Sequence, residues 1–565
     1  MSTFKGLVLS VAFLAASASL PLASAQQSCE KLAGLNLPNT TITMATSVPA
    51  GPFTPPTDFL GNKTPVDLPA FCRVEGTARP STDSEIRFEV WMPATGWNGK
   101  FLVVGNGGFA GFIIYRSMAG PLRRGYATAS TDDGHKGMID VSWAIGHPEK
   151  VVDFGYRAVH VTAQNSEAII HAFYGKDVTQ SYFNGCSDGG REALMEAQRF
   201  PKDFDGIIVG APANSWTHQF AGFVWNEQAT RSDPASYIPP SKLAALQAAA
   251  LAQCKDLDGA QAGILENPSQ CHFDPAVIQC TGADGPNCLT AQQVEAARKI
   301  YSGPRNPVTG EQIYPGYEPG AEAAPVNWPA WITGAAPGGA FQFFFGNAFF
   351  ANMVFENPKW DFRTFNFDKD VKLADDKLGP VLNSTDPDLR RFQATRGKLI
   401  QYHGWADAAV APTDSIHYYE KVVALIREGA RHKRPADALR STQAFYRLFM
   451  VPGMGHCSGG PGADNFGNRP DVPPPQVDGE HDVVNALDRW VVSGVAPDKL
   501  VATKYADDNP AKGIARTHLL CPYPQVAQWT GKGSRDDAAN FVCGAPSGHT
   551  TGSTSAGKGL QKPSN

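Results

Sequence analysis

The chain has 565 residues, of which 42% are hydrophobic and 18% charged, and its formal net charge at pH 7 is −5. This balance is typical of a globular protein, and the length calls for two or more domains or for one domain with a large insertion. Because the sequence has no long run of one charge sign, we expect no nucleic-acid partner.

The first 25 residues have the layout of a signal peptide. Lys5 gives a short positive region, an apolar stretch follows from Leu7 to Ala16, and Ala23-Ser24-Ala25 fits a small-x-small cleavage site. We therefore expect a mature chain that starts near Gln26 and is secreted or periplasmic. The alternative, a disordered N-terminus of a cytosolic protein, leaves the order of these features unexplained. No segment is long and apolar enough to span a bilayer, so we expect no membrane partner.

Residues 26–225 predict the first part of an α/β domain. Helical spacing of apolar residues indicates helices at 154–174 and 191–200. Alternating or continuous apolar runs indicate strands at 86–92, 100–104, 126–131, 180–184 and 205–211. Strands that alternate with helices predict a mostly parallel sheet with helices on both faces.

The alternation stops near residue 225. Residues 226–390 form a separate region that is rich in glycine, proline and aromatic residues and contains the aromatic stretch Phe341–Phe350. The α/β pattern returns in residues 391–545, with strands that end near Tyr402 and Val451 and an amphipathic helix at 483–492. Residues 546–565 are rich in Gly, Ser, Thr and Lys, and we expect them to be a disordered tail.

Ten cysteines follow the predicted cleavage site. An even number behind a signal peptide indicates disulfides in an oxidising compartment, whereas a metal site is disfavoured because no C-x-x-C pair is present. The sequence does not fix the pairing. Short loops favour three pairs of near neighbours, which are Cys254–Cys271, Cys280–Cys288 and Cys521–Cys543.

A candidate nucleophile stands between a predicted strand and a predicted helix. The segment Gly185-Cys186-Ser187-Asp188-Gly189 fits the pattern G-x-S-x-G, in which a sharp turn lifts a serine hydroxyl above the end of a sheet. The helix N-terminus beneath it favours developing negative charge. The simpler alternative is a tight turn with an ordinary serine, but the strand before it and the helix after it favour a nucleophile.

A serine hydroxyl needs a base beside it, and that base needs an acid. His456 and Asp407 each stand just beyond the end of a late predicted strand, which gives the chain order Ser187, Asp407, His456 of an α/β-hydrolase. His403 is a rival base that fits better as a structural turn residue. Asp414 is a rival acid that lies further from its strand end.

An oxyanion hole needs backbone N–H donors. One is expected from Asp188, the residue after the nucleophile, and the other from the early glycine-rich turn 105–111, at Gly107 or Gly108. This turn can also be read as a phosphate cradle. It lacks both the G-x-G-x-x-G spacing and a following helix, which disfavours that alternative.

Two cysteines flank the candidate catalytic residues. Cys186 directly precedes Ser187, and Cys457 directly follows His456. If the serine and the histidine meet in space, these two cysteines are close enough to form a disulfide at the catalytic centre.

With these motifs the sequence resembles the tannase and feruloyl esterase family, which also includes the hydrolase of mono(2-hydroxyethyl) terephthalate. The likeness covers nearly all of the mature chain. The resemblance implies an α/β-hydrolase fold with a large inserted lid domain at about 226–390, and it implies the disulfides Cys29–Cys72, Cys186–Cys457, Cys254–Cys271, Cys280–Cys288 and Cys521–Cys543. Its motifs are carried here by Gly185–Arg191, Gly455–Cys457, His403–Asp407, Phe154–His160 and Asn357–Phe362.

The resemblance also implies a calcium loop in the lid, which here would start at Cys254. Only Asp258 and the carbonyl groups of Ala260 and Ile264 match the expected ligands, because Lys255 and Ala262 replace two carboxylates. Calcium takes about six to eight oxygen ligands and is repelled by a lysine. Asp256 or Glu266 could compensate, but we expect a protein that requires no cofactor.

These observations predict a secreted serine esterase that hydrolyses small esters of aromatic acids, such as feruloyl or galloyl esters, through an acyl-enzyme. A terephthalate monoester carries a free carboxylate, which favours an Arg in the lid. Residues 337–357 contain no Lys or Arg, which favours a neutral phenolic ester, although a basic residue elsewhere could serve. An alternative of another class is an inactive phenolic- or carbohydrate-binding protein on a hydrolase scaffold. The aromatic stretch Phe341–Phe350 either packs the acyl group or forms a core of the lid.

Overall fold

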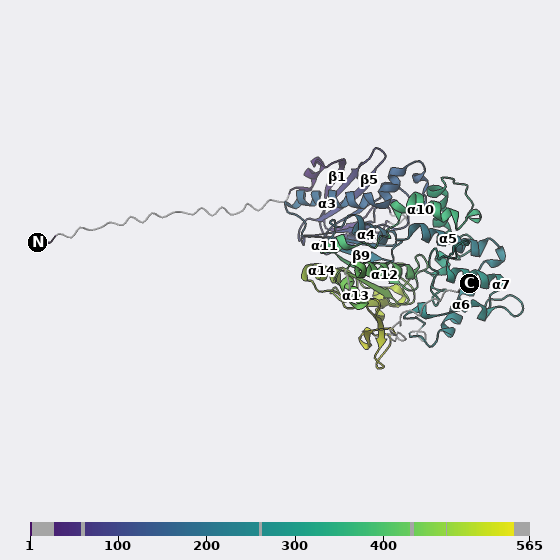
Figure 1. Cartoon of the computed structure of the whole chain (residues 1–565). Helices are drawn as coiled ribbons and strands as arrows, with labels where there is room; N and C mark the ends of the chain where they lie inside the picture. Colours follow the sequence, from purple (N-terminus) through teal and green to yellow (C-terminus); the bar gives the residue numbers. More distant parts are fainter. Residues whose placement is uncertain (3–26, 58–62, 259–262, 430–433, 470–471, 547–565) are drawn as a thin grey trace, which may run out of the picture.

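The structure is a computed structural model that describes residues 1–2, 27–57, 63–258, 263–429, 434–469 and 472–546 (Figure 1). The predicted signal peptide and the predicted disordered tail therefore lie outside the described residues almost entirely, as does Ala260 of the calcium loop. Among the described residues, no helix combines the length and the apolar character that crossing a membrane requires.

A nine-stranded sheet organises the fold. From β7 onwards all neighbouring strands are parallel, whereas β1, β4, β5 and β7 pair antiparallel. The strands in spatial order are β1 (Thr40–Val48), β4 (Phe71–Ala78), β5 (Ile86–Pro93), β7 (Ala127–Thr131), β6 (Lys100–Val104), β8 (Gln180–Cys186), β9 (Gly206–Gly210), β10 (Lys398–Gly404) and β11 (Tyr446–Val451). This arrangement confirms the predicted mostly parallel sheet.

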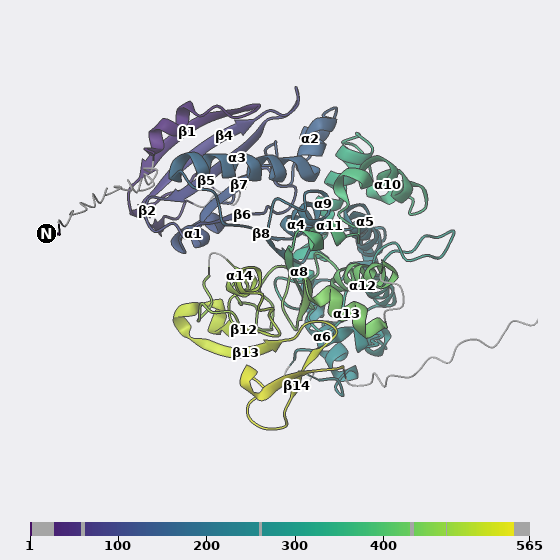
Figure 2. The ribbon, with the colours of Figure 1, turned by 60° about the vertical axis from the view of Figure 1, so that its left-hand side comes forward.

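Helices cover both faces of the sheet because its strands are apolar on both sides. In β6, Phe101 and Val103 join one core, whereas Leu102 and Val104 join the other. The first core is covered by α3 (Ala158–Tyr174), α4 (Asp188–Arg199) and α12 (Pro412–Gly429), and the second by α1 (Tyr115–Arg123) and α14 (Val483–Ser493). Figures 1 and 2 show α3 beside the purple strands of the first half and α14 beside the later elements.

A large helical insertion separates β9 from β10 and lies at the right of Figure 1. The predicted lid boundary at residue 226 falls inside its first helix. The aromatic stretch forms α9 (Phe341–Ala348) and a π-helical turn at Phe349–Val354. The other helices are α5 (Trp216–Arg231), α6 (Pro240–Gln253), α7 (Ala291–Ser302), α8 (Trp328–Trp331), α10 (Lys369–Leu382) and α11 (Arg390–Ala394).

After β11 and α14 the chain ends in two antiparallel hairpins, which the sequence patterns did not predict. The first pairs β12 (Leu500–Tyr505) with β13 (Ile514–Leu520), and the second pairs β14 (Val526–Trp529) with β15 (Phe541–Gly544). Both lie in the yellow part of Figure 2. Neither hairpin joins the main sheet, whose last strand is β11.

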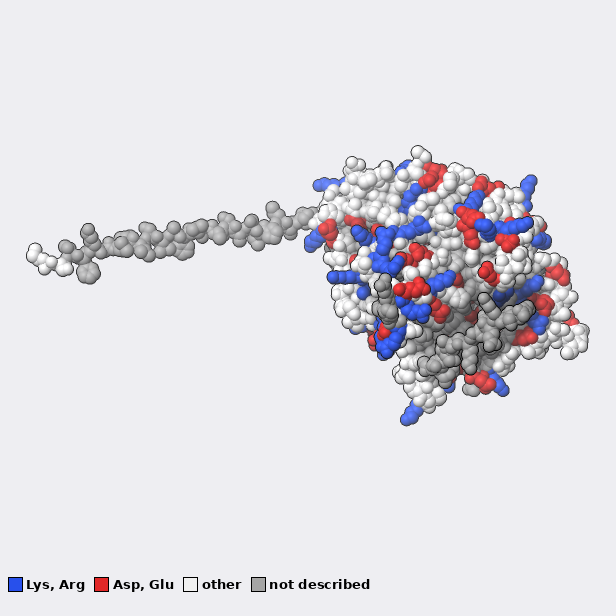
Figure 3. Space-filling view, viewed as in Figure 1, with Lys and Arg blue, Asp and Glu red and all other residues white. Residues whose placement is uncertain are grey.

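All five predicted disulfides are present, and no cysteine of the described residues is free. Cys29–Cys72 joins the first turn of the described chain to β4, whereas Cys186–Cys457 joins segments 271 residues apart. On the face shown in Figure 3, basic and acidic side chains are interspersed.

Candidate active site

Ser187 occupies a strained turn between β8 and α4. Its backbone has φ 67° and ψ −122°, which places this serine in a region that L-residues rarely adopt. The turn requires glycine on either side. A Cβ atom on Gly185 would lie 2.4 Å from the carbonyl oxygen of Gly189, and one on Gly190 would lie 2.3 Å from that of Gly210. Positions 185 and 190 therefore require glycine.

Three side chains form one hydrogen-bonded chain. The Nε2 atom of His456 lies 2.8 Å from Ser187 Oγ, and its Nδ1 atom lies 2.8 Å from Asp407 Oδ2. Each residue follows the carboxyl end of a parallel strand, namely β8, β10 or β11. These distances are within the range of about 2.6–3.2 Å in which a base can take a proton.

The carboxyl group of Asp407 is fully buried and held by backbone donors. Its Oδ1 atom accepts hydrogen bonds from Ala409 N at 2.7 Å and Val410 N at 2.9 Å. Burial raises the pKa of Asp407, but the nearby imidazoles of His456 and His403 outweigh burial and hold the pKa well below its usual range. The carboxylate is therefore charged at neutral pH and orients His456.

The two rival residues have other partners. His403 is completely buried, with Nδ1 2.7 Å from Ser415 Oγ and Nε2 3.2 Å from Asp407 Oδ2, so it supports Asp407 from the side away from the serine. Asp414 accepts a hydrogen bond from Ser215 and makes none with His456 among the described residues. The structure thus brings together Ser187, Asp407 and His456, and leaves both rivals outside the chain.

Backbone N–H groups are available beside the serine. Asp188 is the first residue of α4, and the turn after β6 is drawn against this helix by a hydrogen bond of 2.9 Å from Gly189 N to Asn106 O. In the described part of the chain, the N–H groups of Asp188, Gly107 and Gly108 have no protein acceptor. They are therefore free to donate to a substrate oxygen.

A disulfide crosses the site. Cys186 ends β8 and Cys457 follows His456, with their Cα atoms 6.0 Å apart. The bond therefore ties the serine turn directly to the loop that carries the histidine.

Aromatic side chains of the insertion reach this site. The Trp331 ring meets His456 edge to face at 5.1 Å between centroids and packs against Phe341 at 5.2 Å. Phe345 lies against the Gly108 turn, at 3.3 Å from the position of an added Cβ atom. Phe349 and Phe350 are completely buried. Phe341 and Phe345 thus border the site, whereas Phe349 and Phe350 belong to a core that the insertion shares with the first α/β part.

The calcium loop offers a poor donor set. Asp258 and Lys255 are both exposed, and the Glu266 carboxylate that could have compensated lies 2.9 Å from His518 Nε2. Calcium needs about six to eight oxygen ligands, so the described residues of this loop do not fit the ion.

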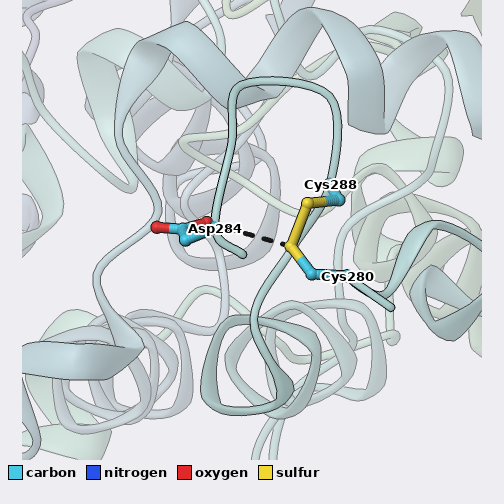
Figure 4. A group of neighbouring side chains, drawn as sticks. All are labelled: Cys280, Asp284 and Cys288. Atoms are coloured by element: carbon cyan, nitrogen blue, oxygen red, sulfur yellow. Dashed lines mark hydrogen bonds between the residues drawn. A yellow bond between two sulfur atoms is a disulfide. The ribbon is translucent and has the colours of Figure 1, made fainter. Parts of the chain in front are cut away.

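The cysteine-containing cluster in Figure 4 offers no metal site either. Cys280 and Cys288 are joined in a disulfide, which leaves no thiolate, and Asp284 forms an ion pair with Lys242.

Comparison with known proteins gives consistent matches. Residues 72–544 match the family described as tannase and feruloyl esterase. An uncharacterised esterase of Xanthomonas campestris pv. campestris is 49% identical over 539 residues, which covers 93% of this chain and 92% of that protein. A protein named probable feruloyl esterase B-2 of Aspergillus flavus is 34% identical over 468 residues, covering 81% of this chain and 84% of that protein.

A solved structure has the same fold. The crystal structure of feruloyl esterase B from Aspergillus oryzae superimposes with a TM-score of 0.82 at 28% identity, covering 91% of this chain and 99% of that one. The α/β-hydrolase architecture predicted from the sequence is therefore confirmed.

Proposed function

Because the chain belongs to the tannase and feruloyl esterase family and is a carboxylic ester hydrolase, we propose that it hydrolyses esters of aromatic carboxylic acids through an acyl-enzyme on Ser187. The observation that carries this proposal is the chain of hydrogen bonds from Ser187 through His456 to Asp407, at 2.8 Å and 2.8 Å.

In the first half-reaction the oxygen of Ser187 attacks the ester carbonyl carbon while His456 Nε2 takes the hydroxyl proton. The carbonyl oxygen gains negative charge and accepts hydrogen bonds from Asp188 N–H and from the N–H of Gly107 or Gly108. The intermediate then collapses, the C–O bond to the alcohol breaks, and His456 returns its proton to the leaving oxygen. Asp407 keeps Nδ1 protonated and stabilises the imidazolium throughout.

In the second half-reaction water replaces the alcohol. His456 takes a proton from the water, whose oxygen attacks the acyl carbon, and the bond to Ser187 breaks as the serine oxygen recovers the proton. The products are the aromatic acid and the free enzyme.

The rings beside the site support an aromatic substrate. Trp331 and Phe345 border His456 and the Gly108 turn, and Phe341 remains 41% exposed next to them. Flat apolar surfaces of this kind stack on a planar acyl group. We propose that feruloyl or galloyl esters are the substrates.

A terephthalate monoester is the alternative within the family, and it presents a free carboxylate. Among the described residues, Arg231 is a cation in contact with the aromatic stretch, since it lies over the ring of Phe343. Its charge is already paired with Glu227. This pairing favours a neutral phenolic ester over the terephthalate monoester.

Two assays test the proposal. A panel of methyl ferulate, methyl gallate and mono(2-hydroxyethyl) terephthalate should give the highest kcat/KM with one of the two phenolic esters, and preference for the terephthalate would overturn the substrate assignment. A fluorophosphonate probe should label Ser187 and should not label a Ser187→Ala variant. Absence of labelling in the wild type would favour the inactive binding protein instead.

We also propose that the protein works outside the cytosol. Five disulfides support an oxidising compartment, and the sequence of the first 25 residues supports export. Edman sequencing of the exported protein should begin near Gln26. Protein that stays in the cytosol with Met1 intact would contradict this location.

A further inference from the structure

Three buried carboxyl groups lie together directly behind the serine turn and take no part in the mechanism above. Asp133 follows β7, and Asp188 and Glu192 occupy the first turns of α4. At least one oxygen from each lies within 4.8 Å of the others, and the residues are 0%, 1% and 3% exposed. Charged groups are rarely buried at this density without partners.

The partners do not suffice for three charges. Arg191 donates to Asp188 Oδ1 at 2.6 Å, and Asn106 N donates to Glu192 Oε2 at 3.0 Å. The remaining four oxygens, which include both oxygens of Asp133, have no hydrogen-bond partner among the described residues. One arginine among three carboxylates would leave a net charge of about −2 in a dry interior, and such a group neutralises by keeping a proton.

The pKa values of two of these carboxyl groups are raised, which favours a protonated carboxyl group in the cluster. Burial, then the charge of Glu192, raises the pKa of Asp133 well above its usual range. Burial also raises the pKa of Asp188 to about 7, although Arg191 opposes the shift. Both shifts have the sign of a carboxyl group that stays protonated near neutral pH.

The cluster is joined to the oxyanion turn through Asn106. The N–H of Asn106 is bound by Glu192, its carbonyl oxygen accepts from Gly189 N at 2.9 Å, and its amide donates to Thr131 O at 2.8 Å. Asn106 directly precedes Gly107. Any shift of the Glu192 carboxyl group therefore moves the donors that we assign to the oxyanion.

We propose that Asp133 is a positioning residue whose carboxyl group stays protonated and donates a hydrogen bond to Glu192. This hydrogen bond holds the oxyanion turn, and the retained proton spares the site a second buried negative charge. This inference rests on the proposed function, because it assigns Asp133 a role in the same reaction.

Other charged and titratable groups surround the cluster, and most of them have partners of their own. His135 stacks on Trp143, Asp132 accepts from the backbone of Arg87 and Gly134, and Asp153 pairs with Arg157. Glu196 lies on the next turn of α4 beside Asp203. Among the described groups that act on Asp133, positive charge comes from Arg191.

The proposal predicts an alkaline limb in the pH profile of kcat. As pH rises, the shared proton is lost, the cluster gains a charge and Glu192 loses its donor, so kcat falls while KM changes little. Asp133→Asn places an amide donor in the same position at every pH. It should keep kcat within about threefold of wild type at neutral pH and should remove the alkaline limb. Asp133→Leu supplies no donor and should lower kcat by about tenfold to a hundredfold, up to the loss typical of one missing oxyanion donor.

The substrate must not titrate, so the assay uses methyl 3,4-dimethoxycinnamate between pH 6 and 10, with the melting temperature recorded at each pH. Glu196→Gln is the control, because Glu196 is buried on the same helix and its pKa is also raised, in part by the charge of Glu192, but among the described residues it makes no hydrogen bond with Asn106. This variant should retain the wild-type alkaline limb.

Glu192→Gln tests the same hydrogen bond from the other side and replaces Asp133→Asn if that variant does not fold. Its amide oxygen can accept from Asn106 N–H and its amide hydrogens can donate to an ionised Asp133, so this variant should also lose the alkaline limb. A wild-type limb in a folded Asp133→Asn or Glu192→Gln variant, or a wild type with a flat profile to pH 10, would overturn the proposal. Fluorophosphonate labelling of Ser187 remains unaffected by either result, so failure here is distinguishable from failure of the proposed function.

Discussion

Replacing Asp407 by asparagine tests how the site orients its base. The carboxylate accepts from His456 Nδ1 through Oδ2 and from two backbone N–H groups through Oδ1. Asparagine can keep the backbone hydrogen bonds through its oxygen, which turns its NH₂ group towards His456. The imidazole then accepts at Nδ1 and carries its proton on Nε2, where it cannot take the proton of Ser187.

The expected loss follows from this change of tautomer. A wrong tautomer costs about 10⁴ in kcat in serine triads, which corresponds to about 5.4 kcal/mol at 1.36 kcal/mol for each factor of ten. The assay is kcat with methyl ferulate at pH 7.5, and Asp414→Asn, which changes the rival acid, is the matched control. If Asp407→Asn kept more than about a tenth of wild-type kcat, or if Asp414→Asn were the damaging change, our assignment of the acid would be wrong.

The same substitution has a consequence for stability. The pKa of Asp407 is lowered in the folded protein, so its charge stabilises the fold above the unfolded pKa of about 3.9, and this stabilisation is lost as pH falls through the lower folded pKa. Asp407→Asn should therefore be less stable than wild type at pH 7, and the difference should shrink on acidification. Urea unfolding at pH 7 and at pH 2.5, which lies below the unfolded pKa, measures it. A difference that grew towards low pH would contradict the pKa direction.

Three further predictions concern the nucleophile, the metal and the disulfide. Ser187→Ala should abolish ester hydrolysis and leave the circular dichroism spectrum unchanged, whereas near-native turnover would exclude Ser187. Calcium should raise the melting temperature little, although an ion at 100 times its Kd adds about 2.7 kcal/mol; a chelator-reversible rise would show that Asp258 and its neighbours still bind it. Replacing Cys186 and Cys457 together by Ala should lower kcat at temperatures where the protein is still folded, and unchanged kcat would show that the bond does not position His456.

The candidate catalytic residues could be predicted from the sequence because each of them directly follows a strand that the sequence predicts. Ser187 follows β8, Asp407 follows β10 and His456 follows β11, and most residues of these three short strands are buried. Parallel strands place their carboxyl ends at one edge of the sheet. The position of each turn in the chain was therefore enough to bring the three side chains together.

At the edge of the sheet opposite β11, the strand β1 gave no such signal. In β1 only Ile42 is buried, because this strand pairs with β4 on one side and faces solvent on the other. Its run of threonines therefore shows no apolar period. The hairpins from β12 to β15 lie outside the main sheet. One side of β12 joins the second core through Leu500 and Ala502, whereas Val501 joins a small separate core with residues of the other strands.

Contacts between the insertion and the site could not be predicted either. Trp331 lies 125 residues before His456 in the chain, and its local sequence gives no indication that the two rings meet. For the same reason the sequence does not show which residues of the aromatic stretch lie at the site. It does not show that Phe349 and Phe350 pack in one core with residues of α5 and α10. The acidic cluster was also missed, since Asp133 becomes a neighbour of Glu192 only once β7 and α4 are placed.

The order of the strands explains why a disulfide stands at this point. β8 and β11 are separated by β9 and β10, so at about 4.8 Å for each strand spacing the turn with Ser187 and the loop with His456 begin about 14 Å apart. The histidine must therefore reach back across two strand ends, on a loop that contains five glycines between Gly453 and Gly462. Backbone hydrogen bonds, such as Gly455 N to Gly459 O at 2.9 Å, hold the buried start of this loop, and proton transfer tolerates a drift of only a few tenths of an ångström. A covalent bond from Cys457 to the residue beside Ser187 limits that drift at the two atoms where it matters, whereas Asp407, whose strand lies next to β11, needs only hydrogen bonds.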